Sequence, residues 1–288
     1  MMNNKYYVSS VAFREKNIDE IINTCENSNL NLEFSSGLPY DSEMEEKFLS
    51  ASVNKLVHNY FPAPKEAFVL NLASVDESVR IKSINLCKKG IMLTANSNAP
   101  FYAAHAGFIF DPDPNELGKN FTNQSYYNKA ESYNRFLQSV NELVSYAEKY
   151  NVVFCIENNV LTKVNFNTFG FKPFFGTEAS ELIDLKNKLD SEHFSILLDT
   201  AHLKISSNTL NLDLHDQINK VLPHIFGVHH SDCNGYYDTN DPVTSHYWFL
   251  KYMPSLADKI HVLEVKNQTV KKIKSQINIL KSRANKVW

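Results

Sequence analysis

The chain has 288 residues, with 29 lysines and arginines against 32 aspartates and glutamates, so its formal net charge is −3. Hydrophobic residues make up 43% and charged residues 21%, which is typical of a globular protein and excludes disordered, collagen-like and coiled-coil chains. Only four residues are arginine, which argues against a protein whose main partner is a nucleic-acid phosphate backbone.

Cysteine usage and the first residues predict a cytoplasmic protein. The four cysteines lie far apart and form no Cys-x-x-Cys pair, so we expect reduced thiols. Residues 1–5 lead into no apolar signal segment. No apolar run approaches the ~18 residues of a membrane span, so we expect no membrane partner.

Short apolar runs, typical of strands that are buried on both faces, recur along the whole chain. Weaker candidates for strands are Val57–Phe61 and Phe68–Leu72. The clearest candidates are Tyr6–Phe13, Asn31–Phe34, Phe101–Phe108, Val152–Ile156, Phe194–Leu198, Ile225–Val228 and Ile260–Val265.

Amphipathic helix patterns separate these runs. Over Asn128–Tyr150, apolar residues recur at spacings of three and four, which places them on one helical face. Similar patterns occupy Asn17–Glu26, Ser78–Asn96, Glu178–Leu189, Asp213–Leu222, His246–Leu256 and Thr269–Lys281.

Strand and helix alternate about eight times without a Gly/Ser linker, which predicts a parallel sheet covered by helices. An open doubly wound sheet would carry a glycine-rich turn after its first strand, but Ser9–Arg14 contains no glycine. We therefore predict an α/β protein in which residues 1–288 form a single (β/α)8 TIM barrel domain.

The predicted strands end in residues that bind metals. Glu157, Asp199, His229 and Glu264 each close an apolar run. In a barrel these strand ends meet at the C-terminal face, where active sites are built. Alone, each carboxylate is more often a helix cap or a solvated loop residue. Together, buried carboxylates with no lysine or arginine on the same strands favour a metal ion as their partner.

The other histidines have different expected roles, according to their positions in the chain. His58 and His105 also follow strands, and each alone would be an ordinary core histidine. His230 follows His229 directly, so we expect its side chain to point away from the barrel interior. We expect structural or surface roles for the remainder: His193, His215, His224, His246 and His261.

With these residues in this order, the chain resembles the xylose-isomerase-like barrel superfamily, which contains sugar and sugar-phosphate isomerases and epimerases together with abasic-site endonucleases. The resemblance covers nearly the whole chain. It is carried by Val57–Pro62, His105–Phe108, Glu157–Asn159, Asp199–His202, His229–Asp232 with Asn234, Gly235 and Asp238, and Leu263–Lys266.

The resemblance implies that Glu157, Asp199, His229 and Glu264 form a central metal site. In the endonucleases, His58 and His105 would correspond to ligands of one further zinc, and His202 and Asp238 to ligands of another. The sequence departs from that pattern at Asn240, where a second histidine is expected. It also has Gly235 where some ketose epimerases carry an arginine.

The first hypothesis is a metal-dependent isomerase or epimerase of a small sugar or sugar phosphate. The oxygen-rich site suits Mn²⁺, Mg²⁺ or Co²⁺, with Zn²⁺ as an alternative. The metal would polarise a carbonyl and stabilise an enediolate while Glu157 and Glu264 exchange protons with the substrate. By the resemblance, His202 would hold a substrate oxygen. Three further side chains are expected in the pocket wall: Lys266, Arg14 and Trp248.

The second hypothesis is a metal-dependent phosphodiesterase of the abasic-site endonuclease kind. His58, His105 and His202 favour it, whereas the acidic balance and Asn240 argue against it. The phenylalanine-rich segment Asn158–Thr177 would be a wedge into DNA under this hypothesis and a hydrophobic lid under the first. A third hypothesis is an inert barrel used for binding. The sequence leaves open the sugar, the metal and whether the protein forms homo-oligomers.

Overall fold

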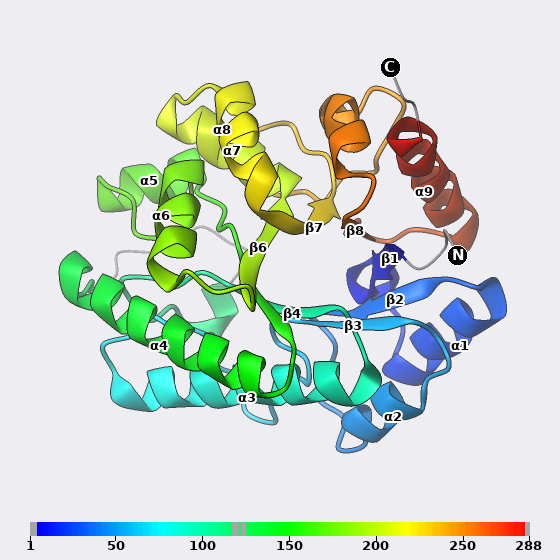
Figure 1. The fold of residues 1–288 in the computed structure, drawn as a ribbon, viewed down its shortest axis with the longest axis horizontal. Coiled ribbons are helices and arrows are strands. Elements are labelled where there is room, and N and C mark those ends of the chain that lie inside the picture. Colours follow the sequence, from blue (N-terminus) through cyan, green and yellow to red (C-terminus); the bar gives the residue numbers. More distant parts are fainter. Residues whose placement is uncertain (1–4, 117–120, 122–124, 286–288) are drawn as a thin grey trace.

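The computed structural model describes residues 5–116, 121 and 125–285, and its eight parallel strands close into a barrel (Figure 1). Each strand pairs with the next one in the chain, and β8 pairs back with β1. The predicted parallel (β/α)8 architecture is therefore confirmed. The strands are β1 (Tyr6–Ser9), β2 (Asn31–Phe34), β3 (Lys55–His58), β4 (Phe101–His105), β5 (Val153–Glu157), β6 (Phe194–Asp199), β7 (Ile225–His230) and β8 (Ile260–Leu263).

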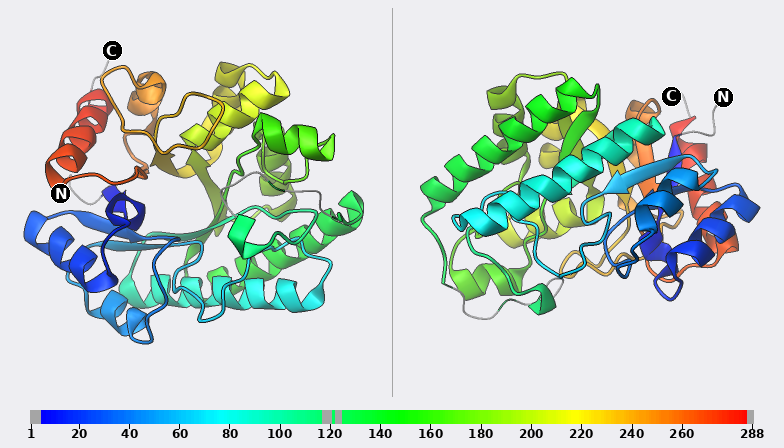
Figure 2. Two further views of the ribbon diagram at one scale, coloured as in Figure 1. Left: turned by 180° about the vertical axis from the view of Figure 1, so that it is seen from behind. Right: turned by 90° about the horizontal axis from the view of Figure 1, so that it is seen from below.

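Helices surround the strands, as the two further views in Figure 2 show. The two longest, α3 and α4, have 21 residues each and lie side by side in these views. The α-helices are α1 (Ile18–Ser28), α2 (Met44–Ser50), α3 (Glu77–Ser97), α4 (Lys129–Lys149), α5 (Lys163–Phe169), α6 (Ala179–Leu189), α7 (Thr200–Leu210), α8 (Leu214–Val221) and α9 (Val270–Ala284). The 3₁₀ helices are η1 (Ser10–Phe13), η2 (Pro114–Glu116), η3 (Leu222–His224) and η4 (Trp248–Leu256).

Side-chain caps fix where several helices begin. Asn17 and Glu20 form a reciprocal capping box at the start of α1. The side chains of Asp76 and Asn128 accept backbone N–H bonds at the starts of α3 and α4. Each such cap stabilises its helix by about 1 kcal/mol.

Alternation along the strands divides the apolar residues into two sets. Outward-facing residues such as Val8, Leu32 and Tyr102 pack in the large core against the helices. The inward-facing residues form a separate cluster inside the barrel: Tyr7, Leu56, Phe101, Ala103, Cys155, Leu197 and Val262. Two positions after six of these residues the chain carries a polar residue: Ser9, His58, His105, Glu157, Asp199 and Glu264. The strand period of two residues therefore stacks a polar layer directly above the apolar filling of the barrel.

Several predicted strand bounds are wrong. Tyr6–Phe13 is a strand only to Ser9, because the Ser9 side chain accepts the Val11 N–H and the chain turns into η1. Phe68–Leu72 forms no strand and lies in the β3–α3 connection, with Val69, Leu70 and Leu72 buried. β4 ends at His105 rather than Phe108.

Helices α2, α5 and α7 were not predicted, and the segment predicted as the helix His246–Leu256 is the 3₁₀ helix η4, which contains Pro254. The proposed lid, Asn158–Thr177, contains α5. Phe174 and Phe175 within it are buried, and the Phe175 ring stacks on Phe136 of α4. None of the described helices is long and apolar enough to cross a membrane.

Candidate metal centre

Four side chains meet where β5 to β8 end. Glu157, Asp199, His229 and Glu264 each place one potential ligand atom within 4.8 Å of the others. Glu157, Asp199 and His229 are fully buried, and the Glu264 side chain is 12% exposed. The barrel thus concentrates three carboxylates and one imidazole in a volume that a single cation can reach.

His229 lies at the centre of this group. Its Nδ1 is 2.8 Å from Glu264 Oε2 and 3.4 Å from Glu157 Oε1. Burial would lower the pKa of His229, but the carboxylates of Glu33, Glu264 and Glu157 raise it well above the usual range. In the absence of a metal, the imidazole therefore carries a second proton, which a divalent cation would replace.

Two buried carboxylate oxygens in this group have no hydrogen-bond partner. Asp199 Oδ1 accepts the backbone N–H of His202 and so caps α7, while Asp199 Oδ2 has no partner. Glu157 Oε1 also has none. Burial raises the pKa of Asp199 to about 7, with Glu264 and Glu157 adding to the shift. Unpaired buried carboxylate oxygens of this kind are what a bound cation would satisfy.

His58 and His105 contact the same glutamate from the other side. Their Nε2 atoms lie 2.7 Å and 3.3 Å from Glu157 Oε2, and the three residues form a second group of potential metal ligands. His58 is buried, whereas the His105 side chain is 26% exposed. Burial would raise the pKa of Glu157, but His105, His58 and His229 hold it well below the usual range. Glu157 is therefore ionised at neutral pH.

His202 and Asp238 extend the site toward the β7–η4 connection. His202 Nδ1 donates to the backbone oxygen of Asn158 at 2.9 Å, and its Nε2 lies 3.6 Å from Asp238 Oδ2. Despite burial, Asp199 and Asp238 raise the pKa of His202 well above its usual value. Lys266 Nζ lies 3.4 Å from the backbone oxygen of Asp238, so this predicted residue is close to the group.

Two of the three predicted substrate-binding side chains are not brought to the cluster. Arg14 is exposed at the end of η1, beside Ser36 and Gly37, and has no hydrogen bond or ion pair to the cluster among the described residues. Trp248 lies at the start of η4 and lines a pocket shared with Arg283 of α9.

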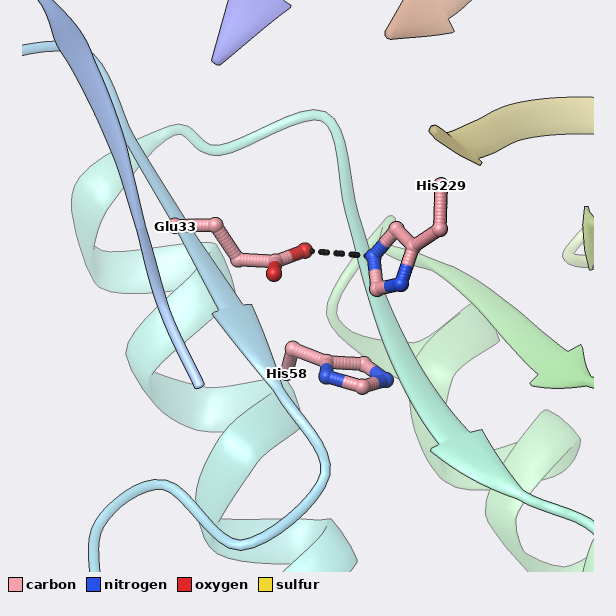
Figure 3. A group of neighbouring side chains, drawn as sticks. All are labelled: Glu33, His58 and His229. Atoms are coloured by element: carbon pink, nitrogen blue, oxygen red, sulfur yellow. Dashed lines mark hydrogen bonds and ion pairs between the residues drawn. The ribbon is translucent and has the colours of Figure 1, made fainter. Parts of the chain in front are cut away.

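Glu33 is a further member of this cluster that was not predicted from the sequence. This residue of β2 is fully buried, and its Oε2 lies 2.9 Å from His229 Nε2 (Figure 3). No individual role was predicted for Asn158, yet its side chain accepts the backbone N–H of Asp199 and donates to the backbone oxygen of Asp199. In the sequence, Glu33 stands in the alternating segment Asn31-Leu32-Glu33-Phe34, and only the closed barrel makes its position inward-facing.

His230 points away from the interior, as predicted. Its Nε2 lies 2.9 Å from His261 Nδ1, and His261 Nε2 donates to the backbone oxygen of Leu256. Both histidines are buried behind β7 and β8 among aromatic side chains. Neither belongs to a group of potential metal ligands among the described residues.

The chain is similar to known proteins in its sequence profile and in its fold. The sequence profile of the xylose isomerase-like TIM barrel family matches residues 6–267. A D-tagatose 3-epimerase-like protein is similar at 20% identity, with a TM-score of 0.73 over 97% of this chain and 96% of that one. No match is found among curated protein sequences.

Two further solved structures have similar folds. D-Psicose 3-epimerase with D-tagatose, from Clostridium cellulolyticum H10, is 17% identical, with a TM-score of 0.63 over 97% of this chain and 95% of that one. A protein from Thermus thermophilus, soaked with zinc chloride, is 16% identical, with a TM-score of 0.65 over 97% and 98% of the two chains. At these identities the likeness demonstrates the shared barrel fold.

Proposed function

Because the chain belongs to the xylose isomerase-like TIM barrel family, we propose that it is a metal-dependent epimerase or isomerase of a sugar or sugar phosphate. The observation that carries the proposal is the meeting of Glu157, Asp199, His229 and Glu264 at the ends of four consecutive strands. The sugar epimerases among the structural neighbours support the same substrate class.

The donor set fits a divalent cation. Three carboxylates and one imidazole suit Mn²⁺, Mg²⁺ or Co²⁺, and Zn²⁺ also accepts these ligands. The unpartnered oxygens of Asp199 and Glu157 are available for the metal. Once bound, the cation would polarise the carbonyl of the sugar.

The protein's own groups then move the proton. Glu157 and Glu264 approach His229 from different strands, and contacts with histidines keep both pKa values below the usual range for a glutamate. One carboxylate takes the proton from the carbon beside the carbonyl, which leaves an enediolate. In an isomerisation, a proton is then returned to the former carbonyl carbon. In an epimerisation, it is returned to the opposite face of the carbon that lost it. The Nε2 side of His202, which faces Asp238, would hold a substrate oxygen.

The test combines metal content with proton exchange. We expect elemental analysis of protein purified without chelator or metal-binding tag to give about one divalent metal per chain. In D₂O, NMR should show deuterium entering the carbon next to the carbonyl of at least one ketose or ketose phosphate. Glu157→Gln and Glu264→Gln should each slow this exchange by roughly 10²- to 10⁴-fold.

The matched control is Glu142→Gln, because Glu142 is an exposed carboxylate of α4 that pairs with Lys88 on the outside of the barrel. This variant should exchange deuterium at the wild-type rate. Absence of a bound metal, or a metal-loaded protein that exchanges no proton with any sugar in the panel, would contradict the proposal.

A phosphodiesterase acting on abasic DNA is the second candidate. It is favoured by the additional group of potential ligands formed by His58, His105 and Glu157, and by the proximity of His202 to Asp238. Clustered metals would activate water and neutralise the leaving oxygen. Close to three zinc ions per chain, together with cleavage of DNA that contains an abasic site, would establish this activity in place of the first.

A further inference from the structure

Glu33 is a fully buried carboxylate inside the barrel. Its neighbours on β2, Leu32 and Phe34, face outward and pack in the large core, so Glu33 faces the barrel interior. In the strand register it pairs with Ser9, the last residue of β1, and with Leu56, an interior apolar residue of β3. A fully buried carboxylate costs several kcal/mol unless a partner compensates it, so this residue requires an explanation.

The partner of Glu33 is the imidazole of His229. Figure 3 shows the carboxylate of Glu33 directed at the ring, with Oε2 at 2.9 Å from Nε2. Glu33 Oε1 has no hydrogen-bond partner. At this distance the carboxylate oxygen of Glu33 is placed to accept a hydrogen bond from the ring, which assigns a proton to His229 Nε2. The opposite nitrogen, Nδ1, then faces Glu264 and Glu157.

We propose that Glu33 is a positioning residue that holds His229 with Nε2 protonated, so that Nδ1 is left to bind the metal. A metal-ligating histidine commonly donates its second N–H to a carboxylate, which fixes the tautomer and the ring orientation. Without Glu33, the ring would be free to rotate or to place its proton on Nδ1. The inference rests on the metal site of the proposed function and adds a residue from β2 to it.

The same residues admit a second interpretation, a metal bound by Glu33, His58 and His229, because their ligand atoms also lie within 4.8 Å of one another. The contacts of His58 argue against it. Its Nδ1 is 2.9 Å from Ser35 Oγ and its Nε2 is 2.7 Å from Glu157 Oε2, so both nitrogens already have partners. A metal there would displace one of these bonds and the Glu33–His229 bond as well.

The test compares three variants of β2. Glu33→Leu removes the acceptor, whereas Glu33→Gln keeps a carbonyl oxygen that can accept from Nε2. Phe34→Leu is the matched control, because the Phe34 ring packs outside the barrel against Phe48 and Phe61 and does not contact His229. Zn²⁺ affinity is measured by competition with a chromophoric chelator, and the protonation of each His229 nitrogen by ¹⁵N NMR of the zinc-loaded protein.

We expect Glu33→Leu to weaken zinc binding by about 10- to 100-fold, Glu33→Gln to weaken it less, and Phe34→Leu to leave it within twofold. In the wild type, the NMR signals should identify Nε2 as the protonated nitrogen and Nδ1 as the metal ligand. This measurement needs no variant and remains decisive if Glu33→Leu does not fold.

Two outcomes would overturn the inference: a wild type in which zinc is bound through His229 Nε2, or a Glu33→Leu variant that binds zinc within twofold of the wild type. Equal weakening in all three variants would also overturn it, because it would reveal a general loosening of β2. A wild type that binds no divalent metal removes both this inference and the proposed function. A wild type that binds zinc with the expected NMR signature but acts on no sugar removes only the proposed function.

Discussion

The two halves of the barrel contribute different chemistry to the same cluster. In the second half, β5 to β8 end in the carboxylates of Glu157, Asp199 and Glu264 and the imidazole of His229. In the first half, β2 to β4 supply Glu33, His58 and His105, each of which contacts one of those residues. The second half assembles the candidate ligands, and the first half supplies groups that hold them.

This division has an electrostatic consequence. Three buried carboxylates would repel one another, yet the pKa of Glu157 lies well below its usual range, because imidazoles from both halves surround it and outweigh the effect of burial. Asp199 is approached by no side chain of β2 to β4 among the described contacts, and burial raises its pKa to about 7. Within the cluster, the carboxylate of Asp199 on β6 is therefore the one whose negative charge a cation would stabilise most.

The largest effect is expected from Asp199→Asn. The amide oxygen can still cap α7 by accepting the His202 N–H, but the variant lacks the carboxylate whose Oδ2 has no partner. We expect loss of the bound metal in elemental analysis and at least a ~10³-fold loss of sugar-dependent deuterium exchange. The metal-free variant should melt no lower than the metal-free wild type, since one buried negative charge has been removed.

A different result would alter the comparison between the halves. If Asp199→Asn kept its metal and its activity, the candidate ligands would not be those of β5 to β8. The group formed by His58, His105 and Glu157 would then become the principal site.

The second prediction concerns the histidines behind the second half. Burial lowers the pKa of His261 from 6.5 to about 4, so the folded protein holds this ring neutral. The unfolded chain binds the proton first as the pH falls, so stability is retained above about pH 6.5 and is lost between 6.5 and 4. The shift corresponds to about 3 kcal/mol at its full extent.

Urea unfolding at several pH values between 7.5 and 4.5 checks this prediction. His261→Gln can still donate to the Leu256 oxygen, and its loss of stability over that interval should be smaller than that of the wild type by up to about 3 kcal/mol. The cluster carboxylates titrate in both proteins and cancel in the difference. Parallel pH curves for the two proteins would show that His261 does not contribute this dependence.

The position of a residue on its strand explains what the sequence could predict. A candidate ligand at the end of an apolar run is visible in the chain, which is why the sequence alone predicts Glu157, Asp199, His229 and Glu264 as a group. The barrel was also predictable, because the alternation of strand and helix persists along the chain without a glycine-rich turn.

Glu33 could not be found in this way. Alternating polar and apolar residues in Asn31-Leu32-Glu33-Phe34 are typical of a strand with one face in water, and only closure of the barrel turns that face inward. Asp199 shows a second limit, since the helix cap that the sequence allows does not exclude a role as a ligand. Asp199 Oδ1 caps α7 while Oδ2 has no hydrogen-bond partner, so the proposed ligand role and the cap use different oxygens.

The smallest effect is expected from His58→Gln and His105→Gln, which test whether the first half only supports the cluster. Each imidazole contacts Glu157 Oε2, which lies on the side of this carboxylate away from His229 Nδ1. If they act as partners of a ligating carboxylate, each variant should retain about one metal per chain and lose roughly 10- to 100-fold in metal affinity or activity. If they are themselves zinc ligands, as in the phosphodiesterase hypothesis, the metal count should fall by one or more. Elemental analysis of the two variants beside the wild type separates these outcomes, because an affinity loss of that size leaves the count unchanged at saturating metal, whereas the loss of a ligand site does not.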